Sequence, residues 1–236
     1  MEIFQQAGRL LWSLDEQLLS CVEVSLLCSL AATLAAVAVG VPLAVLLGRK
    51  QFPGRKTLLV LANTGMAVPT VIIGLVCYML LSRSGPFGSA GLLYTRWGII
   101  AGEFALALPM IVAMFSASAA ALSPALEKTA RTLGAGRSCV FIAILREAEG
   151  GLLAATMAAF GRIVSELGIA MMVGGNIRNS TRTMTTAIAL ETQKGEFAMG
   201  LALGLILLLI ALGINAGMHV IRLPRKRSPG PAGGAN

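Results

Sequence analysis

The sequence predicts an all-α membrane protein with about five transmembrane helices. Hydrophobic residues make up 56% of the 236 residues and charged residues only 13%, whereas soluble domains carry roughly 25% charged residues. The mean hydropathy is +0.80. Five apolar stretches reach the roughly 20 residues that a helix needs to cross the hydrocarbon core of a bilayer. Helix is the expected form because lipid offers no partners to backbone polar groups.

The five expected spans cover residues 24–47, 57–81, 97–122, 150–173 and 197–221. The first two carry no charged residue, and the last carries only His219 near its cytoplasmic end. Glu103 is the one charge in the third span, and we expect it near the outer end, where it reaches water or a polar neighbour. Prolines and glycines inside the spans, such as Pro69 and Gly168, favour a bundle that bends and packs tightly.

The distribution of basic residues predicts the orientation. Four lie in each of the connections after the first and third spans and in the tail, against one to three in each opposite segment. Because cytoplasmic loops carry the excess of Lys and Arg, we expect the N-terminus outside and the C-terminus in the cytoplasm of a multi-pass inner-membrane protein.

The chain divides into three expected regions around these spans. Residues 1–17 form an outer segment, in which residues 3–14 are expected as a short interfacial helix with Trp12 at the membrane surface. Residues 18–222 form the transmembrane domain. The Pro/Gly-rich residues 223–236 are expected to be a disordered cytoplasmic tail.

The connection formed by residues 123–149 is too long for a bare link between spans, and it carries its own helix signals. Ser123 is a favourable N-cap followed by Pro124, and Gly134 is expected to end the first helix. Apolar residues recur along both halves, as Leu126, Ala130 and Leu133, then as Val140, Phe141, Ile144 and Leu145. The pattern predicts helix, glycine, helix, with apolar faces that need a cover. That cover is either the chain's own span ends or a cytoplasmic partner, and the pattern leaves both open.

Several classes of function lack their motifs. No GxxxxGKS/T loop is present, and the glycine-rich GAGRS at 134–138 lacks the lysine and follows no strand. No catalytic or metal-ligand signature occurs, and Cys21, Cys28, Cys77 and Cys139 are expected as small buried hydrophobes. The net charge of +8 resides in loops, so we expect no nucleic-acid partner. A membrane enzyme is disfavoured, while a self-sufficient secondary transporter or channel remains an alternative.

Residues 123–149 resemble the "EAA" loop of binding-protein-dependent ABC permeases, which runs Glu-Ala-Ala, three residues, Gly, nine residues, then an Ile-x-Leu-Pro-like end. Gly134 fits the glycine, and Ile144 follows ten residues later. Lys128, Thr129 and Ala130 fill the first three positions, with Glu127 one position early. Arg146-Glu147 replaces the Leu-Pro end. The resemblance implies that an ATPase docks on Glu127, Lys128, Thr129, Ala130, Gly134, Phe141 and Ile144.

Three further stretches are similar to molybdate, tungstate and sulfate permeases. They are AVPTVIIGL at 67–75, AFGRIVSELGIAMMVGGNI at 159–177 and TMTTAIALETQKGEF at 183–197, and the variant pattern looks closest to tungstate-type permeases. The resemblance implies a five-helix core of the methionine-permease type, a homodimer, a separate cytoplasmic ATPase that carries ATP and Mg²⁺, and an extracytoplasmic oxyanion-binding protein. This chain itself is expected to hold no cofactor and to pass tungstate, or alternatively molybdate or sulfate.

Arg162 and Glu166 are four residues apart in the fourth expected span, on one helix face. Charges at this depth are costly, so both are expected to pair and to face the bundle or a wet cavity. The pair either fixes helix packing or acts at a gate on the ion path, for which the candidates are Arg162, Glu166, Gly168 and Asn176. The expected outer loop 174–196, with Arg178 and Arg182, either receives the oxyanion or only contacts the binding protein.

Overall fold

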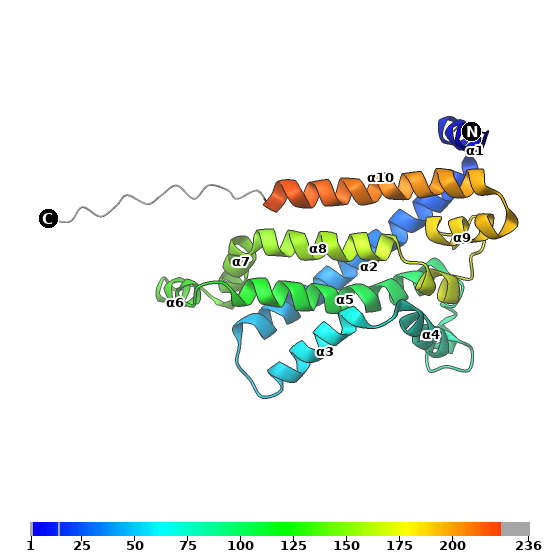
Figure 1. Ribbon diagram of the computed structural model, residues 1–236. Coiled ribbons are helices and arrows are strands. Elements are labelled where there is room, and N and C mark those ends of the chain that lie inside the picture. The colour runs from blue at the N-terminus through cyan, green and yellow to red at the C-terminus, as the bar shows by residue number, and fades with distance from the viewer. Residues whose placement is uncertain (1, 14, 223–236) are drawn as a thin grey trace.

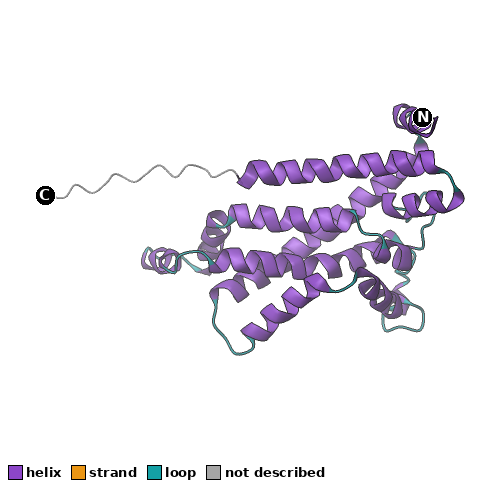
Figure 2. Cartoon of the chain, in the orientation of Figure 1, coloured by secondary structure: helices purple, strands orange, loops and turns teal. Residues whose placement is uncertain are grey.

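Helices make up the framework that the computed structural model describes, which comprises residues 2–13 and 15–222 (Figures 1 and 2). The α-helices are α1 (Glu2–Trp12), α2 (Glu16–Arg49), α3 (Arg55–Ala67), α4 (Thr70–Leu81), α5 (Arg96–Ala120), α6 (Ala125–Thr132), α7 (Arg137–Glu147), α8 (Glu149–Val164), α9 (Met184–Lys194) and α10 (Phe197–Arg222). A 3₁₀ turn, η1 (Gly88–Ala90), and a π-helical turn, η2 (Ala170–Gly174), complete them. The expected tail 223–236 and the side chain of His219 lie outside the described residues.

Three of the described helices, α2, α5 and α10, are long and apolar enough to cross a membrane, and the α3–α4 pair would make a fourth span. That pair is bent by 103°, so the expected continuous span 57–81 is wrong. Pro69 is the reason: it has no N–H, and it forces the preceding Val68 into an extended conformation (φ −63°, ψ 130°). The bend puts α4 across the end of α3.

The expected continuous span 150–173 is also broken. Its helical part, α8, ends at Val164 after 16 residues, and the chain turns through Ser165 and Glu166 before η2 begins. The count of about five spans is therefore approximate: five segments occupy the expected places, but two of them are interrupted.

The helices form a bundle with two distinct ends (Figure 1). Helices α2, α5, α8 and α10 run along its length, whereas α6 and α7 lie at the end that also holds the C-terminal end of α10. The opposite end holds α1 and α9. The centre is the α2–α5 pair, which has the most extensive contact of any two helices. Gly48 allows this approach, since a Cβ there would lie 2.7 Å from the carbonyl oxygen of Ser116.

The outer surface is apolar along several helices, as expected for contact with lipid. Only 17% of the apolar window of α10 is buried, against 56% for α5. A central helix buried on most sides and a peripheral helix exposed on most sides are the two classes that a membrane bundle requires.

The N-terminal segment forms the expected short helix, α1. Ala7 is buried against the rest of the bundle, whereas Trp12 is 92% exposed. Figure 1 shows α1 nearly end-on, beside the end where α10 begins. Its position at the membrane surface stays a prediction.

Candidate functional site

The segment between α5 and α8 has the predicted helix–glycine–helix structure. Gly134 adopts φ +82°, and the N–H of Ala135 donates to the carbonyl of Ala130 at 2.9 Å, as in a left-handed helix stop. A Cβ at Gly134 would meet nothing within 4 Å, so the requirement for glycine is one of backbone conformation alone. At the other end of α6 the N-cap is Pro124, one residue later than expected, and Ser123 Oγ accepts from the N–H of Ala125 at 3.2 Å.

The two helices of this segment differ in what covers them. In α7, Val140 and Ile144 are 7% and 3% exposed and join the main core, so the chain's own helices cover that apolar face. In α6 no residue is buried, and Leu133 at its tip is 81% exposed. Of the two covers that the sequence left open, the first applies to α7 and in part to α6, where Leu126 and Ala130 are half-buried against the core. Leu133, at the tip of α6, stays uncovered. We call α6 and the elbow, residues 125–136, the projecting helix.

Besides the packing of Leu126 and Ala130 on the core, the guanidinium of Arg49 links the projecting helix to the bundle. Arg49, the last residue of α2, is 9% exposed, and its Nε lies 2.6 Å from Glu127 Oε1. Its Nη1 donates to the carbonyls of Leu122 at 2.7 Å and Ala119 at 3.3 Å, and its Nη2 to that of Ser123 at 3.3 Å. Arg49 thus caps the C-terminal end of α5, where a cation is favoured, while it pairs with the first turn of α6.

Sequence reasoning missed this role of Arg49 and counted the residue only among the basic residues of a loop. Its partner Glu127 lies 78 residues further along the chain, and no local pattern connects the two. The other residues expected to contact an ATPase take different positions: Lys128 and Thr129 are exposed on α6, whereas Ala130 and Phe141 are half-buried against the core.

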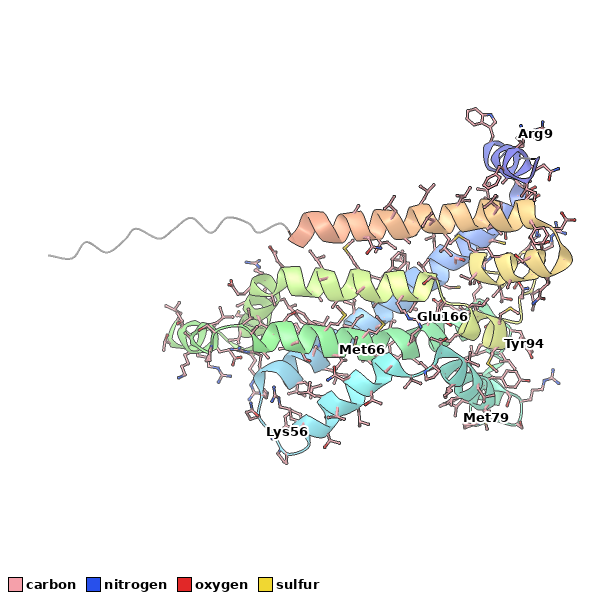
Figure 3. All side chains as sticks on the ribbon, in the orientation of Figure 1. Arg9, Lys56, Met66, Met79, Tyr94 and Glu166 are labelled. Atoms are coloured by element: carbon pink, nitrogen blue, oxygen red, sulfur yellow. The ribbon has the colours of Figure 1, made fainter. Side chains whose placement is uncertain are left out.

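Glu166 lies just beyond α8 rather than on it, so the expectation that Arg162 and Glu166 share one helix face is wrong in detail. The pair nevertheless forms, with Arg162 Nη1 2.9 Å from Glu166 Oε2. The other carboxylate oxygen accepts from the N–H of Gly168 at 2.8 Å, and Thr185 Oγ1 donates to the Glu166 carbonyl at 2.8 Å. The break in the span therefore satisfies its freed backbone groups with Glu166 and Thr185 (Figure 3 labels Glu166).

Burial of the two charges is unequal. The Glu166 side chain is 4% exposed, while that of Arg162 is 45% exposed. The carboxylate is thus held inside by two donors, and the guanidinium faces out of the single chain.

The two broken spans meet each other. A Cβ at Gly168 would lie 3.4 Å from Thr70 Oγ1 and 3.3 Å from the Val71 side chain, at the start of α4. A Cβ at Gly74 would in turn lie 3.3 Å from the carbonyl oxygen of Gly168. Interrupted helices that meet inside a membrane protein are typical of transport pathways, because they bring backbone polar groups to the interior.

The expected outer loop 174–196 is wrong, because residues Met184–Lys194 form α9. The helix begins with a capping box, in which Thr183 Oγ1 accepts from the N–H of Thr186 and the Thr186 hydroxyl accepts from the N–H of Thr183. Both threonines are buried. A Thr-x-x-Thr signal was present in the sequence, and reading it as a capping box would have placed the helix.

At this end the structure joins Asn176 to Arg182, rather than to the Arg162–Glu166 pair. Asn176 adopts φ +52°, and its side-chain oxygen accepts from Arg182 Nε at 3.1 Å. The Arg182 side chain is only 12% exposed, and its Nη1 lies 3.8 Å from the buried Glu191. Arg182 is therefore held within the protein, whereas Arg178 is exposed to solvent.

Glu103 contacts a polar neighbour, Ser29, which is one of the two surroundings expected from the sequence, and it does not reach water. It is 2% exposed, because the tight α2–α5 contact covers it, and Oε1 lies 3.4 Å from Ser29 Oγ of α2. Among the described residues no hydrogen-bond partner reaches Oε2.

Cys21 and Cys28 are buried as expected, while Cys139 is exposed.

These features define a class of protein: an apolar helix bundle with interrupted spans and one projecting helix at its end. Residues 40–222 match the family described as "Binding-protein-dependent transport system inner membrane component", and the chain belongs to that family of ABC transporter permeases. The resemblance inferred from its motifs is thereby confirmed.

Similar proteins narrow the class to the anion permeases. The tungstate uptake system permease protein TupB of Campylobacter jejuni is 39% identical over 219 residues, covering 93% of this chain and 92% of that protein. A probable anion ABC transporter permease of Haloferax volcanii is 39% identical, covering 84% and 88%. The molybdenum permease ModB of Escherichia coli is 30% identical, covering 80% and 90%.

Two solved structures confirm the expected methionine-permease-type fold. The MetNI methionine ABC transporter, in an inward-facing conformation, gives a TM-score of 0.68 at 19% identity, covering 88% of this chain and 96% of the matched one. A bacterial ABC transporter for the polysaccharide alginate gives 0.72 at 18% identity, covering 93% and 84%.

Proposed function

We propose that this chain is the membrane-spanning permease of a tungstate importer. It works as a homodimer with a separate cytoplasmic ATPase, which holds the ATP and Mg²⁺, and with an extracytoplasmic oxyanion-binding protein. The observation that carries the proposal is the projecting helix: an exposed helix with an apolar tip, linked to the ends of two spans by Arg49. Identity to TupB over nearly the whole chain supports tungstate as the ion.

The orientation proposed is N-terminus outside and C-terminus in the cytoplasm. The projecting helix, the α2–α3 connection and the end of α10 share one end of the bundle (Figure 1), and the basic residues concentrate there, which supports a cytoplasmic position for that end. The projecting helix then faces the ATPase. We propose that ATP binds only to the partner ATPase and that this chain holds no cofactor.

The half-exposed Arg162 supports a second copy of the chain and a path beside it. An arginine facing lipid within a span costs on the order of 2.5–3.5 kcal/mol, so its exposed face requires water or protein. In a homodimer, Arg162, Glu166 and Gly168 would line a wet path between the copies, with Asn176 near its outer entrance. Pairing with Glu166 weakens the positive charge, so that a dianion passes without being trapped.

We expect the assembled transporter to prefer tungstate. Purified permease, ATPase and cognate binding protein are placed in vesicles, and tungsten uptake is measured by elemental analysis in the presence of excess molybdate or sulfate. Molybdate, which nearly matches tungstate in size and charge, should compete far better than sulfate. Equal competition by sulfate, or uptake of sulfate in place of tungstate, would reject tungstate as the substrate and leave the permease class standing.

A further inference from the structure

A cavity of about 400 Å³ opens between the last turns of α2 and the α6–α7 segment. It is distinct from the interrupted spans and from the tip of the projecting helix. Its rim carries the side chains of four basic residues, Arg49, Lys50, Arg131 and Arg137, and one acidic residue, Glu127. Basic residues therefore outnumber acidic ones in the lining, and the cavity carries a net positive charge.

Pairing inside the rim leaves three of these cations available. Arg49 and Glu127 neutralise each other at 2.6 Å. Lys50, Arg131 and Arg137 are exposed, and none of them makes an ion pair or a side-chain hydrogen bond with any residue that the structure describes. Three cations converging on one cavity indicate an anionic ligand.

The floor of the cavity is apolar and continues into the outer face of α2. Pro42 and Leu46 line it, and with Lys50 they are spaced four residues apart, on one face of the helix. The same face carries a short row of exposed apolar side chains in the two turns before the cavity, Val39, Leu43 and Leu46, which we call the apolar stripe. The basic rim therefore stands where this short apolar stripe ends.

We propose that this cavity binds the headgroup of an anionic phospholipid. Its phosphate lies among Lys50, Arg131 and Arg137, and an acyl chain follows the apolar stripe of α2. A basic pocket between spans at the cytoplasmic surface is the arrangement that recognises anionic headgroups. A free phosphate ion would use the rim but leave the apolar stripe without a function. The proposal rests on the proposed orientation, which places this end at the cytoplasmic leaflet.

A lipid in this position would join α2 to both helices of the coupling segment. Arg131 belongs to the projecting helix and Arg137 to the first turn of α7, so one phosphate would contact both sides of the Gly134 elbow. A bound lipid would hold the projecting helix in a fixed orientation relative to the bundle.

The test measures lipid binding and not transport. Fluorescent phosphatidylglycerol is titrated into the purified full-length permease in zwitterionic detergent, with phosphatidylcholine as the neutral comparison. The site variant combines Lys50→Gln, Arg131→Gln and Arg137→Gln. The matched control combines Lys56→Gln, Lys128→Gln and Arg146→Gln, three exposed cations at the same end that do not line the cavity. Figure 3 labels Lys56.

We expect the site variant to lose phosphatidylglycerol affinity by about ten-fold or more, and the control to stay within about two-fold of the unaltered protein. Equal losses in the two variants would overturn the proposal, because they would mean attraction by overall charge. Displacement of the lipid by inorganic phosphate would overturn it in favour of a free-ion site. Loss of ATPase co-purification with lipid binding unchanged would assign the three cations to the ATPase. A failure of tungstate transport would leave this measurement unaffected.

Discussion

Replacing Arg49 by glutamine is expected to uncouple ATP hydrolysis from ion uptake. The substitution removes the partner of Glu127 and the donors to three carbonyl groups at the end of α5. Hydrogen bonds to a charged group contribute about 1.5–3 kcal/mol each. Without them we expect the projecting helix to lose its fixed orientation while the spans stay folded. The number of ions imported per ATP hydrolysed should fall about ten-fold, which corresponds to roughly 1.4 kcal/mol of lost coupling.

The matched control is Arg55→Gln. Arg55 lies at the same end and likewise caps a helix carbonyl, donating to Leu47 at 2.5 Å, but it makes no ion pair with α6 in the described part of the chain. The transporter assembled with Arg55→Gln should import nearly the normal number of ions per ATP hydrolysed. Glu127→Gln should resemble Arg49→Gln, and the double variant should be little worse than either, because the two side chains act through one contact. If Arg49→Gln keeps the same ratio as Arg55→Gln, the coupling role is wrong.

The second large effect is expected at the broken fourth span, where Arg162→Ala should be the most destabilising single change. It leaves the Glu166 carboxylate, 4% exposed, without its cation, and leaving a buried charged group without a partner costs about 3 kcal/mol. Glu166→Gln should be milder, since the amide oxygen still accepts from Gly168 and Arg162 is 45% exposed. The measurement is the thermal unfolding midpoint of the purified protein.

The double variant Arg162→Met with Glu166→Gln separates the two roles of the pair. Its unfolding midpoint should recover most of the loss, because no unpaired charge is buried. If the pair only fixes helix packing, uptake should recover with stability. If Arg162 meets the ion, uptake should stay low in a stable protein. An Arg162→Ala protein that unfolds at the normal temperature would contradict the energetic argument itself.

Local signals account for the parts of the fold that were predicted. Hydropathy located the spans, since the cost of exposing apolar helices acts residue by residue, and Ser123 with Gly134 bounded α6 because caps depend on a few adjacent groups. Pro69 could have placed the bend in the second span. The break after Val164 depends on a local contact, from the N–H of Gly168 to Glu166, and on Thr185, which another segment contributes and no local pattern could indicate.

The candidate site was harder to predict, because its contacts join distant parts of the chain. The Arg162–Glu166 pair followed from sequence spacing and is present. Arg49 did not, since Glu127 lies 78 residues away. For Glu103 the sequence left water or a polar neighbour open, and the structure has the polar neighbour, Ser29. Burial at the α2–α5 contact depends on how closely two helices approach, and a sequence pattern does not specify that distance.

The central claim is that this chain conducts an oxyanion only when a partner ATPase acts on its projecting helix. The direct measurement is tungsten uptake into vesicles that contain the permease with its binding protein, in the presence and absence of the ATPase and ATP. We expect uptake only with the ATPase and ATP together, and none with an ATPase that binds ATP but cannot hydrolyse it. Uptake by the permease without the ATPase would contradict the claim and identify a self-sufficient transporter or channel.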